Sequence, residues 1–253
     1  MITQIKVCLN GGRRRVEHPA VPITTTELAE AAAAAVAAGA EAVHLHPRGG
    51  DGNESLRSGD VAAAVAAVRQ ACPGVEIGVS TGLWICNGDV QSREAMVTRW
   101  ALIPSFERPD FASANVSEPG FAELVGLLRE AGIAVEAGVW STADARKLAA
   151  TESAAGWARI LTEIINVPAD GAVEAADEIL QNLDELGVEG PRLLHGEEAA
   201  CWPLVAHAGR LGVPTRIGLE DTIVGPGGEP VPDNADLVRL ARAVWTAANE
   251  GRR

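Results

Sequence analysis

Short apolar runs alternate with longer amphipathic or alanine-rich segments along the whole chain. The runs have the length and β-branched content of buried strands, and the longer segments have the helical spacing of apolar positions. Strands are expected at residues 5–9, 42–46, 76–79, 111–116, 134–139, 160–165, 192–195 and 215–219. Helices are expected at residues 24–38, 59–70, 92–101, 121–131, 143–150, 171–186, 201–211 and 236–248. Capping chemistry at 24–27 and stop glycines at 39, 132 and 187 support these boundaries.

Eight strand-then-helix units of about 30 residues each predict a (β/α)₈ TIM barrel. No linker or shift in composition divides residues 1–253, so a single domain is expected. A doubly wound open sheet is the alternative. It usually has fewer strands at this length, and no Gly-x-Gly-x-x-Gly follows the first strand.

Polar side chains recur where the predicted strands end. Since the carboxyl ends of barrel strands carry the working groups, they form one candidate site. The residues are His44, His46, Ser80, Thr81, Ser113, Asn115, Arg216, Glu220 and Asp221.

His44 and His46 are two residues apart in a strand and therefore face the same side, with Leu45 opposite. Two imidazoles at a strand end suit a divalent metal such as Zn²⁺, for which Glu220 is the natural third ligand. Strands two and eight are separated only by strand one in the barrel, so Glu220 can reach the two histidines. The alternatives are an inert, hydrogen-bonded histidine pair and a salt bridge from Glu220 to Arg216.

Several residues near this site have two interpretations. Asp221 is either free for proton transfer, oriented by Arg216, or an N-cap. Ser80 is either a donor to a substrate carboxylate or a turn residue. Arg48 is expected to pair with a carboxylate or anion, or to be solvated, and His195 is a pocket residue or a satisfied core histidine.

The net charge of −13 argues against nucleic-acid and anionic-membrane partners. The four cysteines are scattered without a Cys-x-x-Cys pair, as in reduced cytoplasmic proteins. The N-terminus lacks a signal-peptide pattern, and the apolar stretch at 29–40 is too short to span a bilayer. A cytoplasmic location is therefore expected.

Five ordered motifs carry a family resemblance: Asn10-Gly11-Gly12, His44-Leu45-His46-x-Arg48, Val79-Ser80-Thr81-Gly82, Asp110-Phe111-Ala112-Ser113-Ala114-Asn115 and Arg216-Ile217-Gly218-Leu219-Glu220-Asp221. Together with Asn234-Ala235-x-Leu237-Val238, they resemble the β-keto acid cleavage enzyme family over almost the whole chain.

The resemblance implies a (β/α)₈ barrel with one Zn²⁺ per chain on His44, His46 and Glu220. It implies a retro-Claisen exchange in which a β-keto acid and acetyl-CoA, the co-substrate, become acetoacetate and a new acyl-CoA. Ser80 and Ser113 would contact the keto acid, and Asp221 with Arg216 would handle its proton. A homo-oligomer, commonly a tetramer, is also implied.

Further pocket residues are expected at Asn10, Thr81, Asn115 and Glu136. Strand five departs from the family, which often has Glu-x-Glu where this chain has Glu136-Ala137-Gly138. Ser113 replaces a threonine of the founding member and keeps the hydroxyl.

Arg13 stands where the founding member, which takes an amino-substituted keto acid, has an acidic residue. An arginine there would repel a cation and could pair with a carboxylate. The sequence thus predicts a β-keto acid with a neutral or anionic side group. Alternatively, Arg13 points to solvent or meets a CoA phosphate.

Three other functions compete with this interpretation. Zinc hydrolases of the amidohydrolase type carry His-x-His on the first strand and further histidines on strands five and six, where this chain has Glu136 and Glu163. Lyases of the hydroxymethylglutaryl-CoA type carry the pair late in the barrel. The third is a non-catalytic metal-binding or ligand-sensing barrel.

Overall fold

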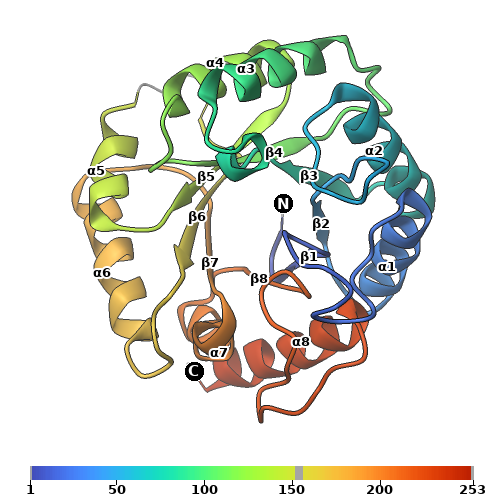
Figure 1. Ribbon diagram of the computed structural model, residues 1–253. Coiled ribbons are helices and arrows are strands. Elements are labelled where there is room, and N and C mark those ends of the chain that lie inside the picture. The colour runs from blue at the N-terminus through green and yellow to red at the C-terminus, as the bar shows by residue number, and fades with distance from the viewer. Residues whose placement is uncertain (1, 152–155, 252–253) are drawn as a thin grey trace.

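The computed structural model describes residues 2–151 and 156–251, and it contains a closed barrel of parallel strands in the order β1 to β8. The strands are β1 Ile5–Cys8, β2 Ala42–Leu45, β3 Glu76–Ser80, β4 Phe111–Asn115, β5 Ala134–Val139, β6 Arg159–Ile164, β7 Arg192–Gly196 and β8 Thr215–Ile217. The helices are α1 Thr25–Ala37, α2 Ser58–Ala71, α3 Val90–Thr98, α4 Phe121–Glu130, α5 Thr142–Ala149, α6 Ala172–Glu185, α7 Cys201–Leu211 and α8 Asn234–Glu250. They form a ring around the barrel (Figure 1), which confirms the predicted (β/α)₈ fold and excludes an open sheet.

The first helix illustrates how local sequence sets the elements. The Thr24 hydroxyl accepts a hydrogen bond from the Glu27 N–H, and the Glu27 carboxylate accepts one from the Thr24 N–H, which is the predicted capping box. Leu28, Ala32 and Ala35 recur at helical spacing and are buried. The helix therefore packs by one apolar face against the barrel and its neighbours.

The third unit differs from the prediction of one helix at 92–101. The Asp89 carboxylate caps the N–H groups of Gln91 and Ser92, so α3 begins at Val90. A 3₁₀ turn, η2 Arg99–Leu102, replaces the last part of the predicted helix, and another, η1 Leu83–Cys86, lies between β3 and α3.

The last strand is shorter than predicted. The Leu219 N–H bonds at 2.8 Å to the side-chain oxygen of Asn234 instead of continuing the ladder with β1. The Asp221 N–H then closes a turn onto the Gly218 carbonyl at 2.9 Å. Glu220 and Asp221 consequently lie on a turn just beyond the strand.

Inside the barrel, Lys6 and Arg159 both bind the carboxylate of Glu136, and none of these side chains is more than 6% exposed. Burial alone would raise the pKa of Glu136, but the two cations hold it well below its usual range. The Arg159 guanidinium also lies 4.2 Å from the Phe111 ring centroid and pairs with Glu76 at 2.9 Å. This cluster fills the barrel with compensated charge.

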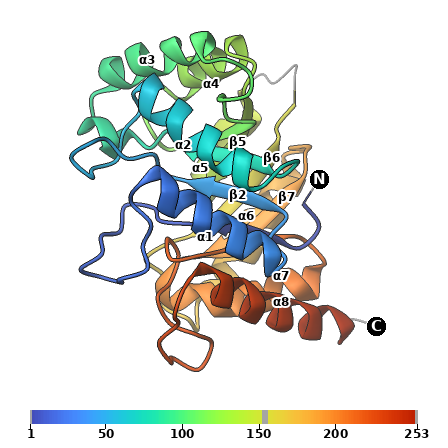
Figure 2. The same cartoon turned by 90° about the vertical axis from the view of Figure 1, so that its right-hand side faces the viewer.

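A side view shows both ends of the chain at the right, where the strands begin, and the loops that follow the strands at the left (Figure 2). Among residues 2–151 and 156–251, no helix is both long and apolar enough to cross a bilayer.

Candidate active site

A cavity of about 230 Å³ lies at the carboxyl ends of the strands. Predicted residues on its wall are Arg13, His44, His46, Ser80, Ser113, Asn115, Arg216 and Glu220, and residues that the prediction omitted are Glu17, Trp84, Trp140, Glu163 and Glu197. A larger cavity of about 380 Å³ lies at the opposite mouth, and no predicted site residue is among the described residues that line it. The smaller cavity is therefore the candidate active site.

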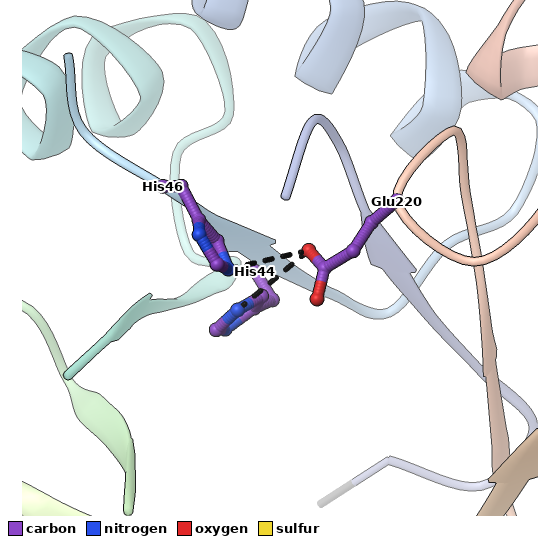
Figure 3. Close-up of side chains that lie close together, drawn as sticks. All are labelled: His44, His46 and Glu220. Atoms are coloured by element: carbon purple, nitrogen blue, oxygen red, sulfur yellow. Dashed lines mark ion pairs between the residues drawn. The ribbon is translucent and has the colours of Figure 1, made fainter. Parts of the chain in front are cut away.

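His44, His46 and Glu220 converge on one point of this cavity (Figure 3). The Glu220 Oε2 atom lies 3.8 Å from His44 Nε2 and 3.6 Å from His46 Nε2. The two imidazole centroids are 5.2 Å apart at 82°, so their nitrogens face the carboxylate from different directions. All three potential ligand atoms lie within 4.8 Å of one another.

The hydrogen bonding of this cluster fits a metal ion. Glu220 Oε1 accepts from Arg216 Nη2 at 2.9 Å, whereas Oε2 is buried and has no hydrogen-bond partner among the described residues. A buried acceptor that faces two imidazole nitrogens is costly unless a cation joins them. Two histidines and one carboxylate are also a ligand set of catalytic Zn²⁺ sites.

Burial lowers the pKa of His44 to about 3, so this imidazole already has the neutral form that ligates a metal. Burial would also lower the pKa of His46, but the carboxylates of Glu220 and Glu54 raise it to about 9. His46 would therefore give up a proton when a metal binds.

Arg216 orders the carboxylates beside this cluster. Its Nε and Nη2 atoms donate to Asp221 Oδ1 at 3.0 and 2.7 Å. Asp221 is completely buried, its Oδ2 has no partner in the described part of the chain, and burial raises its pKa. The orientation of Asp221 by Arg216 matches the prediction, and the N-cap alternative is wrong because the next described helix begins at Asn234.

Glu163, which was not among the predicted site residues, enters the cavity from β6. It accepts hydrogen bonds from Trp140 Nε1 at 2.9 Å and from His195 Nε2 at 2.8 Å. Burial would raise the pKa of Glu163, but His195 and Arg216 lower it to about 2. His195 is buried and bonds to Glu163 through Nε2, but its Nδ1, 3.7 Å from Asp221, has no hydrogen-bond partner among the described residues, so only one of its two ring nitrogens is satisfied.

Gly138 occupies a position on β5 that has no room for a side chain. A Cβ there would lie 2.6 Å from Glu163 Oε1 and 2.8 Å from Asn115 Oδ1. The missing side chain leaves the space that the carboxylate from β6 occupies. The contact of Gly138 with Asn115 and Glu163 depends on the register in which β5 pairs with β4 and β6, and this register could not be predicted from the sequence.

The remaining predicted residues differ in position. Ser80 and Ser113 line the cavity, while Thr81 is buried and donates to the Ser113 carbonyl at 2.5 Å. Asn115 lines the wall and donates to Glu118 at 2.9 Å. Asn10 is buried, where it accepts from the His46 N–H and donates to the His46 carbonyl, both at 2.9 Å, so it fixes the backbone of a potential ligand.

Arg13 lies at the cavity wall, where it pairs with Glu198 and, at 3.3 Å, with Glu17. Arg48 was expected to pair with a carboxylate, but it forms no such pair among the described residues. Its guanidinium donates to the carbonyls of Gly11 and Arg13 and so supports this loop. Glu136 is not brought to the described cavity wall because Lys6 and Arg159 hold it inside the barrel.

A TIM barrel with a His-x-His pair and a glutamate at the carboxyl ends of its strands is a scaffold suited to metal-assisted chemistry. The family model described as beta-keto acid cleavage enzyme matches residues 3–252. The chain belongs to the beta-keto acid cleavage enzyme family.

Two curated relatives have informative names. One, from Cupriavidus necator, is named 3-oxoadipate:acetyl-CoA acetyltransferase and is 40% identical over 122 residues, which are 48% of this chain and 39% of the relative. Another, from Fusobacterium nucleatum subsp. nucleatum, is named 3-keto-5-aminohexanoate cleavage enzyme and is 39% identical over 79 residues, 31% of this chain and 29% of the relative. The chain thus matches less than half the length of each.

A solved structure described as a binary complex of ObcA with oxaloacetate is similar to this barrel, with a TM-score of 0.66 and 18% identity. The match covers 92% of this chain and 66% of that chain. At this identity the similarity shows a shared fold.

Proposed function

We propose that the chain catalyses the retro-Claisen exchange of a β-keto acid with acetyl-CoA. The carbon–carbon bond beside the keto group breaks, and the two-carbon acid fragment joins the acetyl group to give acetoacetate. The released acyl group is transferred to CoA. The observation that carries the proposal is the convergence of His44, His46 and Glu220 in a chain that the family model matches over residues 3–252.

We propose Zn²⁺ as the metal, held by His44, His46 and Glu220. When bound, it would supply a Lewis acid that polarises the keto group. Two observations support this assignment: Glu220 Oε2 has no hydrogen-bond partner in the described part of the chain, and His44 is in its neutral form.

Groups on the cavity wall would bind the substrate, and Asp221, which is buried beside the lining residues Arg216 and Glu220, would manage its proton. The hydroxyls of Ser80 and Ser113 lie on the cavity wall, where they could donate to the keto acid. Asp221, held by two hydrogen bonds from Arg216, would take the proton from the carbon between the two carbonyl groups. Arg216 also holds Glu220, so one cation orients both the base and a potential ligand.

The proposed substrate has a neutral or anionic side group. Arg13 lies on the cavity wall, and the relative named 3-oxoadipate:acetyl-CoA acetyltransferase has a dicarboxylic keto acid in its name. A substrate carboxylate would compete with Glu198 and Glu17 for this guanidinium.

The substrate proposal is tested by comparing kcat/KM for a dicarboxylic and an amino-substituted β-keto acid. We expect wild type to prefer the dicarboxylic acid and Arg13→Glu to reduce or reverse that preference. A preference of wild type for the cationic substrate, or an unchanged ratio in Arg13→Glu, would refute it.

The reaction is tested by incubating the pure protein, loaded with Zn²⁺, with acetyl-CoA and a library of β-keto acids. Mass spectrometry should detect acetoacetate and one new acyl-CoA in equal amounts. His46→Ala should form neither. If wild type produces no acyl-CoA from any member, or releases free acid by hydrolysis, the proposed exchange is wrong.

A further inference from the structure

The two histidines of the cluster are supported differently. His46 Nδ1 lies 2.5 Å from Glu54 Oε1, whereas His44 Nδ1 has no hydrogen-bond partner among the residues that the structure describes. An ionised carboxylate only accepts, so Nδ1 of His46 must carry the hydrogen. When His46 gives up its other proton to bind a metal, the lone pair is therefore left on Nε2, the nitrogen that lies 3.6 Å from Glu220.

The chain brings Glu54 to this position by folding back after β2. The Ser55 N–H bonds to the Pro47 carbonyl at 2.9 Å, and the Gly49 N–H bonds to the Asn53 carbonyl at 2.8 Å. This loop returns directly beside the strand end that carries His46. The side chain of Glu54 is only 15% exposed, so its charge needs partners.

Trp84 also holds Glu54. Its Nε1 atom lies 3.2 Å from each oxygen of Glu54, and its ring stacks on His46 at a centroid distance of 6.3 Å and an angle of 24°. The ring folds back over Gly82, where a Cβ would overlap it. An indole that is 48% exposed is thereby held against the imidazole.

We infer that Glu54 and Trp84 are positioning residues that hold His46 in the tautomer and ring orientation that ligate the metal. The inference rests on the proposed metal site and adds residues outside its ligand set. Glu54 acts through the hydrogen bond to Nδ1, and Trp84 acts by orienting Glu54 and covering one face of the imidazole. Such carboxylate–histidine–metal arrangements raise the basicity of the ligand as well as its order.

The test measures Zn²⁺ affinity of the metal-free full chain by competition with a chromophoric chelator, without substrate. Glu54→Ala should weaken binding by about 10- to 100-fold. Trp84→Phe keeps a ring but loses the N–H donor, so a smaller loss is expected. Asp51→Asn alters the same loop without touching His46 and should bind Zn²⁺ as wild type does.

Glu54→Gln is measured beside Glu54→Ala, since its amide oxygen can still accept from Nδ1 and its affinity should lie between the alanine variant and wild type. Circular dichroism establishes that each variant is folded. If folded Glu54→Ala and Glu54→Gln both bind Zn²⁺ within twofold of wild type, Glu54 is merely structural and the inference alone fails. If wild type itself binds no Zn²⁺, the proposed metal site fails and the inference with it.

Discussion

At the scale of single residues, the two carboxylates after β8 each use their two oxygens differently. Glu220 Oε1 accepts a hydrogen bond from Arg216, and Oε2 faces the histidines. The salt bridge and metal ligation were predicted from the sequence as alternatives, but the structure allows both. Asp221 accepts both bonds from Arg216 at Oδ1, and Oδ2 has no partner within the described residues. In each carboxylate, one oxygen is held by Arg216, and the other is available to bind a metal or to accept a proton.

Asp221→Asn is expected to separate metal binding from turnover. The amide keeps an oxygen for Arg216 but cannot take a proton, so kcat should fall by about 10²-fold or more. Zn²⁺ content, measured by elemental analysis, should equal that of wild type. Normal turnover by this variant would place the base elsewhere.

At the scale of elements, the strands, helices and first capping box were predictable because each depends on neighbours within a few residues. His44, His46, Ser80 and Glu220 were identifiable because they sit at strand ends, which the barrel gathers at one mouth. Glu54 and Glu163 were not, because a loop that folds back and the pairing of β5 with β6 determine their positions. The same limit explains why Glu136, a strand residue like Glu163, was wrongly expected beside the cavity.

Gly138→Ala tests the fit between β5 and β6. The new methyl group would meet Glu163 and Asn115, and such overpacking typically costs about 1–3 kcal/mol of unfolding free energy. We expect a lower midpoint in urea and reduced turnover, because the Glu163 carboxylate must move. Gly126→Ala, on α4 with open space around the position, is the control and should not lose stability.

At the scale of the whole molecule, the barrel has two chemically different halves. Its interior holds a charge cluster in which Glu136 and Glu76 compensate Lys6 and Arg159, while its carboxyl mouth holds the cavity and the potential metal ligands. Assembly into a homo-oligomer stays a prediction from the family resemblance, which light scattering would test.

Glu136→Gln should strongly destabilise the fold. Removing one partner of a buried ion cluster typically costs about 3–5 kcal/mol, since Lys6 and Arg159 remain buried. The pKa of Glu136 is lower in the folded than in the unfolded chain, so its contribution is present above about pH 4.3 and is lost as the pH falls further. Urea unfolding at pH 7 and pH 3 should therefore show less acid dependence in the variant than in wild type, and equal dependence would contradict this role.

Zn²⁺ should stabilise the folded chain. Free metal at about 100 times its dissociation constant adds about 2.7 kcal/mol if only the folded state binds, which raises Tm by several degrees. Calorimetry with Zn²⁺ and with excess chelator measures the shift. His46→Ala should show no shift, and a shift as large as that of wild type would remove His46 from the site.

The potential ligands lie on either side of the seam where β8 pairs with β1. His44 and His46 are synthesised well before Glu220, and only the pairing of β8 with β1 brings Glu220 to them. A nascent chain can therefore hold only two of the three ligands until the barrel has closed. Acquisition of the proposed metal would therefore follow closure of the barrel, and a chain interrupted before β8 cannot form the complete three-ligand site.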